Sequence, residues 1–208
     1  MKRYFVISAL LAAFAAGCLC AVAQTATAAR AAEIVGALSA KFRALNAYEV
    51  SFTLTSGDYS VSGSYRVEGE RYNLSVGDAE VFADGKVRYE VDRARREVTV
   101  VEVDTASRNL LNDPVHAFEF ADAGYSSSLV WEREGRAAVR LTPASSDAAT
   151  AGIITLTLST SDLRPQTLEY DYDGERITIA INSFGSSSAS CPAFDRARFA
   201  DYEFIDFR

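Results

Sequence analysis

The sequence contains few side chains of the kinds that catalyse reactions. Its single histidine, His116, leaves a histidine-based metal site and the common hydrolytic triads without the parts they need. His116 follows Pro114 in a segment with a helical pattern, where we expect a partly exposed structural residue. The run Ser126-Ser127-Ser128 is typical of a polar loop. No GxSxG turn, phosphate-binding loop or dinucleotide fingerprint is present, so these chemistries are not expected.

Carboxylates are numerous, but their spacing does not favour acid/base catalysis. Those of two segments alternate with apolar neighbours and so belong to the solvent face of predicted strands: Glu132 and Glu134, and Glu169, Asp171 and Asp173. A glycosidase needs two carboxyl groups that converge to about 5–10 Å. Nothing singles out such a pair, and we therefore expect a protein that is not an enzyme and needs no cofactor or metal.

The first residues have the composition of an export signal. Lys2 and Arg3 precede an uncharged, mostly apolar stretch over 4–19, and Ala21-Val22-Ala23 offers a small-x-small cleavage site. The apolar stretch is shorter than the roughly 20 residues that a membrane-spanning helix needs. We therefore expect residues 1–23 to be a cleaved signal peptide.

Two alternatives stay open for this N-terminus. The segment could be retained as a membrane anchor, or Ala15-Ala16-Gly17-Cys18 could act as a loose lipobox that makes Cys18 a lipidated N-terminus. All three interpretations take the chain out of the cytoplasm, and we expect a periplasmic protein. Cleavage after Ala23 would leave a single domain over 24–208, long enough to bury its own core.

Cysteine content and net charge exclude further classes of protein. Cys191 would be the one cysteine left after cleavage, so an internal disulfide is excluded and we expect an inert thiol. The formal net charge of −7 would become −9 once Lys2 and Arg3 are removed. Such an acidic chain is not expected to bind nucleic acid or to adhere to an anionic membrane surface. If lipid is its ligand, the protein must enclose it.

A helix and then a series of short strands must build the fold. From Ala26 to Leu45, apolar side chains recur at spacings of three and four, which predicts an amphipathic helix. After Asn46 the period becomes two, which predicts strands separated by glycine turns such as Ser56-Gly57-Asp58 and Asp84-Gly85. The predicted helix and the first strands place the following apolar residues on one face: Ile34, Val35, Leu38, Phe42 and Leu45 in the helix, and Val50, Phe52, Leu54, Val61, Gly63, Tyr65, Val67, Tyr72, Leu74, Val76, Val87, Tyr89, Val91, Val98 and Val100 in the strands.

The middle of the chain interrupts this meander. Between Asn109 and Gly124 the alternation is lost, and Asn112-Asp113-Pro114 predicts the start of a short helix. Strands resume after Gly124 and include a hairpin that turns at Asp173-Gly174. Ser126–Ser128 and Ser186–Ser190 are expected to be polar loops.

The alternation alone fits a packed β-sandwich as well as a barrel. Consecutive hairpins with few long connections favour an up-and-down barrel, and large apolar side chains on the inward face favour a lipid-sized lumen. We expect a mainly β (α+β) fold: an incomplete antiparallel barrel of roughly 11 strands with a helical lid or plug. The candidate lumen and lid contacts are Val50, Phe52, Leu54, Tyr65, Tyr72, Leu74, Tyr89, Val100 and Phe118.

In order along the chain, these landmarks resemble the outer-membrane lipoprotein carrier family (LolA-like). The first strands, Tyr48 to Leu54 and Ser62 to Val67, are similar to those of the family, and so is the Asp84-Gly85-Lys86 hairpin with its Arg96-Glu97-Val98-Thr99-Val100 strand. The central Asn112-Asp113-Pro114 segment with Gly124-Tyr125 resembles the family's helical segment. The end of the chain, from Phe194-Asp195 to Ile205-Asp206-Phe207-Arg208, resembles its C-terminal motif.

The resemblance implies a monomeric carrier that binds the acyl chains of lipoproteins. It also implies partners: acylated lipoproteins, an inner-membrane ABC-type lipoprotein release complex, and an outer-membrane acceptor. One departure from the family concerns the lid. Better-known members carry an Arg-Pro pair after the second strand, whose Arg helps to hold the lid shut, and Glu68-Gly69-Glu70-Arg71 stands at that place here. A related half-barrel that senses lipid or lipoprotein is the alternative function.

Overall fold

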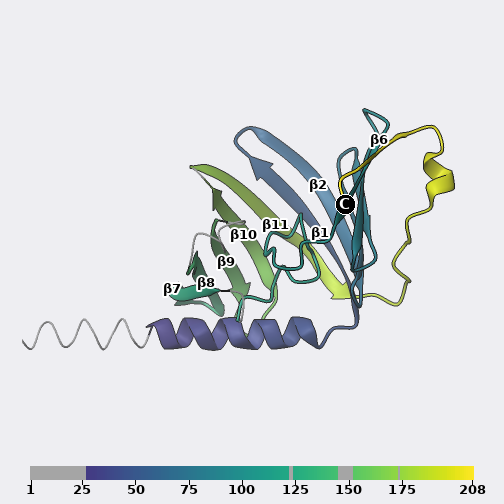
Figure 1. Ribbon diagram of the computed structural model, residues 1–208. Coiled ribbons are helices and arrows are strands. Elements are labelled where there is room, and N and C mark those ends of the chain that lie inside the picture. Colours follow the sequence, from purple (N-terminus) through teal and green to yellow (C-terminus); the bar gives the residue numbers. More distant parts are fainter. Residues whose placement is uncertain (1–26, 122–123, 145–151, 173) are drawn as a thin grey trace, which may run out of the picture.

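The computed structural model describes residues 27–121, 124–144, 152–172 and 174–208 (Figure 1). The expected signal peptide and the Cys18 lipobox lie outside these residues. The described residues form an N-terminal helix over 27–43, a single large sheet and a short 3-10 helix, η2 (Arg196–Phe199), before the last strand. The strands are β1 (Ala47–Ser56), β2 (Tyr59–Glu68), β3 (Arg71–Val76), β4 (Ala79–Ala83), β5 (Val87–Asp92), β6 (Glu97–Glu102), β7 (Tyr125–Arg133), β8 (Arg136–Pro143), β9 (Ile153–Ser159), β10 (Pro165–Tyr172), β11 (Glu175–Ser186) and β12 (Glu203–Asp206).

The sheet is a curved, unclosed half-barrel. Its strand order is β12-β6-β5-β4-β3-β2-β1-β11-β10-β9-β8-β7, so β12 and β7 form its two edges. Neighbouring strands are antiparallel except at the β12 edge, where Glu203–Asp206 pairs with β6 in parallel. The expected incomplete barrel is confirmed, with twelve strands and one parallel pair in place of a purely antiparallel sheet.

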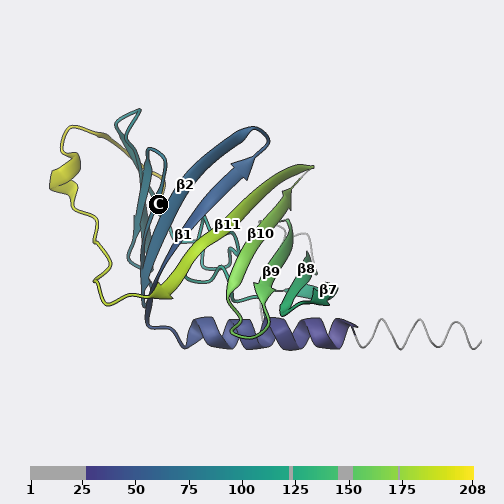
Figure 2. The same cartoon turned by 180° about the vertical axis from the view of Figure 1, so that it is seen from behind.

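The helix over 27–43 lies along one end of the concave sheet (Figures 1 and 2). Ile34, Leu38 and Phe42 are buried in the same core cluster as the concave face of the strands, which confirms the predicted apolar stripe. Arg30 holds the first turns against β7, because Nη2 and Nε donate to the two carboxylate oxygens of Glu132 at 2.7 and 3.0 Å. Among the described residues no helix has the length and apolar character to cross a membrane.

The register of β1 and β2 creates a tight contact in this core. Phe52 lies opposite Gly63, and a Cβ built on Gly63 would come within 2.4 Å of the Phe52 ring. The glycine therefore makes room for the aromatic ring on the concave face. The predicted glycine turns are also present; at Gly85, φ is +90°, a conformation that favours glycine.

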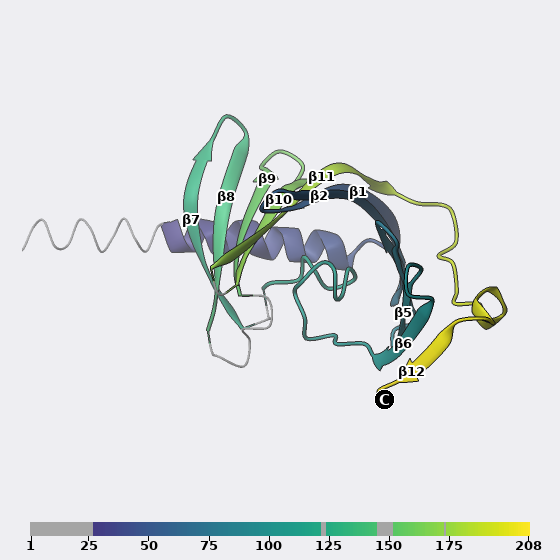
Figure 3. The same ribbon diagram turned by 90° about the horizontal axis from the view of Figure 1, so that it is seen from above.

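The segment over 103–121, which we call the plug, runs inside the concavity without regular structure (Figure 3). The short helix predicted at Asn112-Asp113-Pro114 is therefore wrong. The side chain of Asn109 accepts a hydrogen bond from the backbone N–H of Leu111. The side chain of Asp113 likewise accepts a hydrogen bond from the backbone N–H of Val115. Such local side-chain bonds compete with helical ones, so the segment folds as consecutive turns.

The described residues form two apolar clusters on opposite faces of the sheet. The larger one fills the concave side with the helix, the strands and the plug. The smaller one lies on the convex side, where the C-terminal segment 187–206 passes outside β5 and β6 (Figure 3) and packs Phe199 against Phe82. Strand β4 contributes to both clusters, because Val81, Phe82 and Ala83 are consecutive and all buried.

One of the two predicted polar loops has a different structure. Ser126–Ser128 belong to β7, where their pattern of alternating exposure is that of an edge strand. The other predicted loop is confirmed over 187–190, which have no regular structure, while Ser186 is the last residue of β11. Short polar side chains suit a strand as well as a loop when one of its faces meets water.

Candidate functional site

The concave face of the sheet brings most of the predicted lumen residues together. In the β1–β2–β3 register, Val50, Tyr65 and Leu74 form one row across the sheet. Tyr72 lies in a neighbouring row, and Phe118 comes from the plug and stacks on Phe42 with a centroid distance of 4.3 Å. Seven of the nine candidates are buried in this cluster: Val50, Phe52, Leu54, Tyr65, Tyr72, Leu74 and Phe118.

Tyr89 and Val100, the remaining two candidates, do not line the concavity. They lie opposite each other on β5 and β6 but face the convex side, where Tyr89 stacks on Phe194 at 4.0 Å and Val100 is buried in the smaller cluster. Their assignment to the lumen is therefore wrong. Alternation assigns a side chain to one of two faces without orienting the faces, and in β5 and β6 the apolar face is covered by the C-terminal segment.

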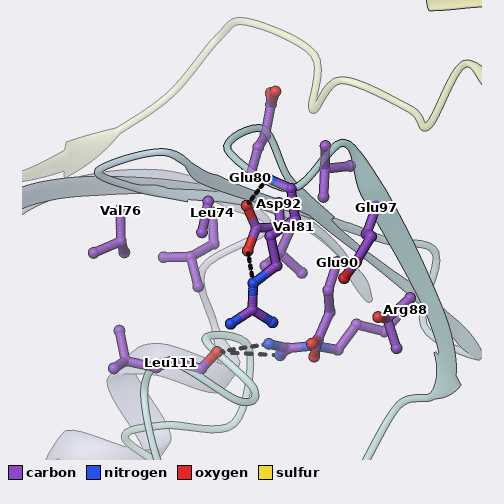
Figure 4. Close-up of a pocket in the computed structure, with 13 residues that line it drawn as sticks. Leu74, Val76, Glu80, Val81, Arg88, Glu90, Asp92, Glu97 and Leu111 are labelled. Carbon is purple, nitrogen blue, oxygen red and sulfur yellow. Dashed lines mark hydrogen bonds and ion pairs between the residues drawn. The ribbon is translucent and has the colours of Figure 1, made fainter. Parts of the chain in front are cut away.

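The concave face between β3 and β6 is correspondingly mixed in character (Figure 4). An open cavity of about 380 Å³ has apolar walls made by Leu74, Val76, Val81 and Leu111. Its other wall is charged, with Arg88, Glu90, Asp92, Arg95 and Glu97. A volume above about 300 Å³ is in the range of small-molecule sites, and this lining suits a molecule with an apolar chain and a polar end.

Tyrosines of the concave wall hold the plug by its backbone. Tyr48 Oη donates to the carbonyl of Pro114 at 3.1 Å, and Tyr72 Oη to that of Asn112 at 2.9 Å. Tyr170 Oη accepts from the N–H of Leu110 at 3.1 Å. Because the plug is irregular, its own backbone does not satisfy these groups, and the wall does. Burial raises the pKa of Tyr48 and of Tyr170, so both phenols stay protonated.

Arg88 also holds the plug by its backbone and was not among the residues predicted from the sequence. Its guanidinium donates twice to the carbonyl of Leu111, both at 3.1 Å, and also to the carbonyl of Asn112 and to Tyr72 Oη. Nε donates to Glu90 at 2.6 Å, and only 11% of the side chain is exposed. Arg88 thus supplies, from β5, a contact to the segment that fills the barrel.

His116, in the plug, contacts two carboxylates. Its Nδ1 lies 2.6 Å from Asp113 Oδ2, and its Nε2 lies 4.0 Å from Glu70. The hydrogen bond with Asp113 is the main reason that the pKa of His116 is raised above its ordinary value of 6.5. Asp113 is itself completely buried, so His116 is its local counter-charge when protonated.

The surroundings of His116 and Cys191 do not favour nucleophilic catalysis by either residue. The ring of His116 pairs with the carboxylates of Asp113 and Glu70, which are not nucleophiles of the serine or cysteine type. Cys191 is buried on the convex side, and burial raises the pKa of its thiol, which disfavours the reactive thiolate. Within the ranges that the structure describes, no three His, Cys, Asp or Glu side chains gather so that they could hold a metal ion.

No family model matches the sequence, and no curated protein is similar to it. Among solved structures, the chain is similar to an uncharacterized conserved protein from Thermus thermophilus, with 11% identity and a TM-score of 0.49 over 84% of this chain and 98% of that one. It is also similar to a LolA superfamily protein from Nitrosomonas europaea, with 9% identity and a TM-score of 0.43 over 77% and 94% of the two chains. A domain described as an outer membrane lipoprotein-sorting protein, from Vibrio parahaemolyticus, gives 8% identity and a TM-score of 0.46 over 84% and 97%.

Proposed function

We propose that this protein is a periplasmic lipoprotein carrier that encloses acyl chains on the concave side of its half-barrel. It would take acylated lipoproteins from an ABC-type release complex of the inner membrane and deliver them to an acceptor at the outer membrane. The protein would act as a monomer and without catalysis.

The observation that carries this proposal is that an irregular segment, the plug, fills the apolar concave side of the barrel. The concave wall is mostly apolar, and the plug that covers it is an irregular segment. The plug is attached through side-chain hydrogen bonds from Tyr48, Tyr72, Tyr170 and Arg88. A segment of this kind opens at lower free energy than a strand held by a continuous ladder of backbone bonds. Its removal would expose an apolar chamber that is continuous with the existing cavity beside Leu111.

The chemistry of the ligand follows from the apolar side chains that the plug buries against the wall. Leu110, Ala117, Phe118 and Phe120 are almost fully buried against the wall. An acyl chain that replaced them would restore the apolar contact that opening the plug removes. Each methylene that leaves a membrane costs about 0.8 kcal/mol, so a carrier must return most of this free energy through its own chamber.

A release assay tests the carrier function directly. Spheroplasts that make a labelled lipoprotein are incubated with the purified mature protein, and the supernatant is examined for a soluble one-to-one complex. We expect release by the wild-type chain and by Val130→Glu, which changes an exposed side chain of β7. We expect much weaker release by Val76→Glu, which puts a charge on the apolar wall of the cavity.

A hydrophobic dye separates the ways in which this proposal could fail. Dye binding to the native protein without lipoprotein release would contradict a carrier and favour the sensing function. Absence of both dye binding and release would contradict the chamber itself.

A further inference from the structure

Tyr65 differs from the other buried tyrosines of the concave wall. Tyr48, Tyr72 and Tyr170 each share a hydrogen bond with the backbone of the plug. The hydroxyl of Tyr65 is also buried, but it has no hydrogen-bond partner among the described residues. Since a buried hydroxyl without a partner destabilises the form that buries it, its presence requires an explanation.

The position of Tyr65 shows that packing does not need this hydroxyl. The ring lies between Phe52 and Tyr48, at centroid distances of 6.3 and 6.0 Å, and the residue is only 2% exposed. A phenylalanine would make the same ring contacts without burying an unpaired polar atom. The chain uses phenylalanine at the neighbouring position 52, so an aromatic ring without a hydroxyl is accommodated in this part of the wall.

Tyr65 lies on the concave face, in the row next to the tyrosines that hold the plug. Tyr65 lies in a row with Val50 and Leu74, and Leu74 also lines the open cavity. The next row contains Tyr48 and Tyr72, whose hydroxyls donate to carbonyl oxygens of the plug. Burial raises the pKa of Tyr65 well above its ordinary value, so its phenol remains a hydrogen-bond donor.

We propose that Tyr65 is the polar anchor of the chamber and donates its hydrogen bond to the carbonyl oxygen of an ester- or amide-linked acyl group. This inference rests on the proposed function and adds a specificity to it. The chamber would select acyl chains, which carry a carbonyl, over alkyl chains of the same length. The tyrosines released from the plug would then offer further donors to the same end of the ligand.

A matched pair of lipids tests this selection. Two lysophospholipids are compared that have the same head group and chain length, one with an ester-linked acyl chain and one with an ether-linked alkyl chain. Their affinities are measured by displacement of N-phenylnaphthylamine from the native protein. A neutral hydrogen bond in a buried site corresponds to a preference of about fivefold for the ester lipid.

The variant Tyr65→Phe is expected to bind the two lipids equally well, with the affinity for the ether lipid unchanged. It should also melt at the same temperature as the wild type or up to about 2 °C higher, because it removes an unpaired buried group. The control Tyr59→Phe, which alters an exposed tyrosine, should keep the ester preference.

Three results would overturn the inference. The first is an equal affinity of the wild type for the two lipids, and the second is an ester preference that persists in Tyr65→Phe. The third is a clear fall in the melting temperature of Tyr65→Phe, which would show that the hydroxyl already has a partner, such as a buried water. Failure of the wild type to bind either lipid would instead refute the proposed function on which the inference rests.

Discussion

Arg88→Ala should loosen the plug while leaving the sheet folded. The substitution removes every hydrogen bond from the guanidinium to the carbonyls of Leu111 and Asn112, and also the contact with Tyr72. The sheet itself does not depend on this side chain, because the β4–β5 and β5–β6 pairings are made by backbone groups. The effect should therefore be confined to the equilibrium between the closed and the open plug.

The magnitude follows from the number and the burial of these bonds. A hydrogen bond to a charged group contributes about 1.5–3 kcal/mol, and the Arg88 side chain is too little exposed for solvent to screen it strongly. The bonds share one guanidinium, and water solvates the carbonyls once the plug opens, so their contributions are not additive. We expect a loss of about 3 kcal/mol, which raises the population of the open plug roughly a hundredfold.

Two measurements detect this shift. Native-state hydrogen exchange of backbone amides in 103–121 should accelerate by about two orders of magnitude, while the amides of β1 and β11 keep their protection. The apparent affinity for a lysophospholipid should increase by up to the same factor, since the closed plug no longer competes as strongly. Arg88→Lys should show an intermediate effect, because an ammonium group cannot donate in a planar fork.

Arg95→Ala is the matched control. Arg95 lines the same cavity, but its guanidinium contacts Asp92 and is largely exposed. This variant removes no hydrogen bond or ion pair to the plug, within the residues that the structure describes, and should show the wild-type exchange over 103–121. If Arg88→Ala left both the exchange of 103–121 and the lipid affinity unchanged, the hydrogen bonds to Leu111 and Asn112 would not control the plug.

Three further predictions concern other parts of the molecule. Because the pKa of His116 is raised by Asp113, the protonated form stabilises the closed plug fully below pH 6.5 and loses this contribution as the pH rises through the raised value. The protection of 103–121, expressed relative to the intrinsic exchange rate at each pH, should fall over that range in the wild type and stay constant in His116→Asn. Gly63→Ala should destabilise the fold by about 1–3 kcal/mol in urea unfolding, because its Cβ would overlap the Phe52 ring, and a double mutant with Phe52→Leu should recover part of the loss. Phe199→Ala should cost about 3–5 kcal/mol of stability by emptying the convex cluster, yet leave dye affinity unchanged; a parallel fall in dye affinity would contradict the separation of the two faces.

Local pattern was sufficient to predict most of the fold. The stripe with Ile34, Leu38 and Phe42 predicts the helix, and the alternation around Phe52 and Leu74 predicts strands with one buried face. Glycine turns between them predict hairpins and hence an antiparallel meander. These features depend on residues close in the sequence, which explains why they could be predicted.

The errors arose where distant segments decide the structure. Tyr89 was assigned to the lumen because nothing in β5 shows that Phe194, far later in the sequence, covers its face. A signal was present in Val81-Phe82-Ala83, since a strand without alternation has apolar side chains on both faces. Recognising that the apolar face changes side at this strand would have moved Tyr89 and Val100 out of the lumen.

The contacts of the plug were also beyond reach of local pattern. Arg88 has the sequence surroundings of an ordinary polar residue in an alternating strand, and its role depends on a segment that passes across the concavity. The turns over 109–115 arise because Asn109 and Asp113 bond their own neighbours in place of continuing a helix. Whether the segment forms turns or a helix depends on the side chains of the concave wall, which donate hydrogen bonds to the remaining carbonyls of the plug.

The most direct test of the account is to map where an acyl chain lies when bound. A lysophospholipid with a photoactivatable group at the end of its chain is bound to the mature protein, irradiated, and the modified residues are identified by mass spectrometry. The account predicts adducts on concave residues of the wall, such as Phe52, Tyr65 and Leu74, together with faster hydrogen exchange over 103–121 in the complex. Adducts confined to the convex cluster around Phe194 and Phe199, with the plug as protected as before, would contradict it.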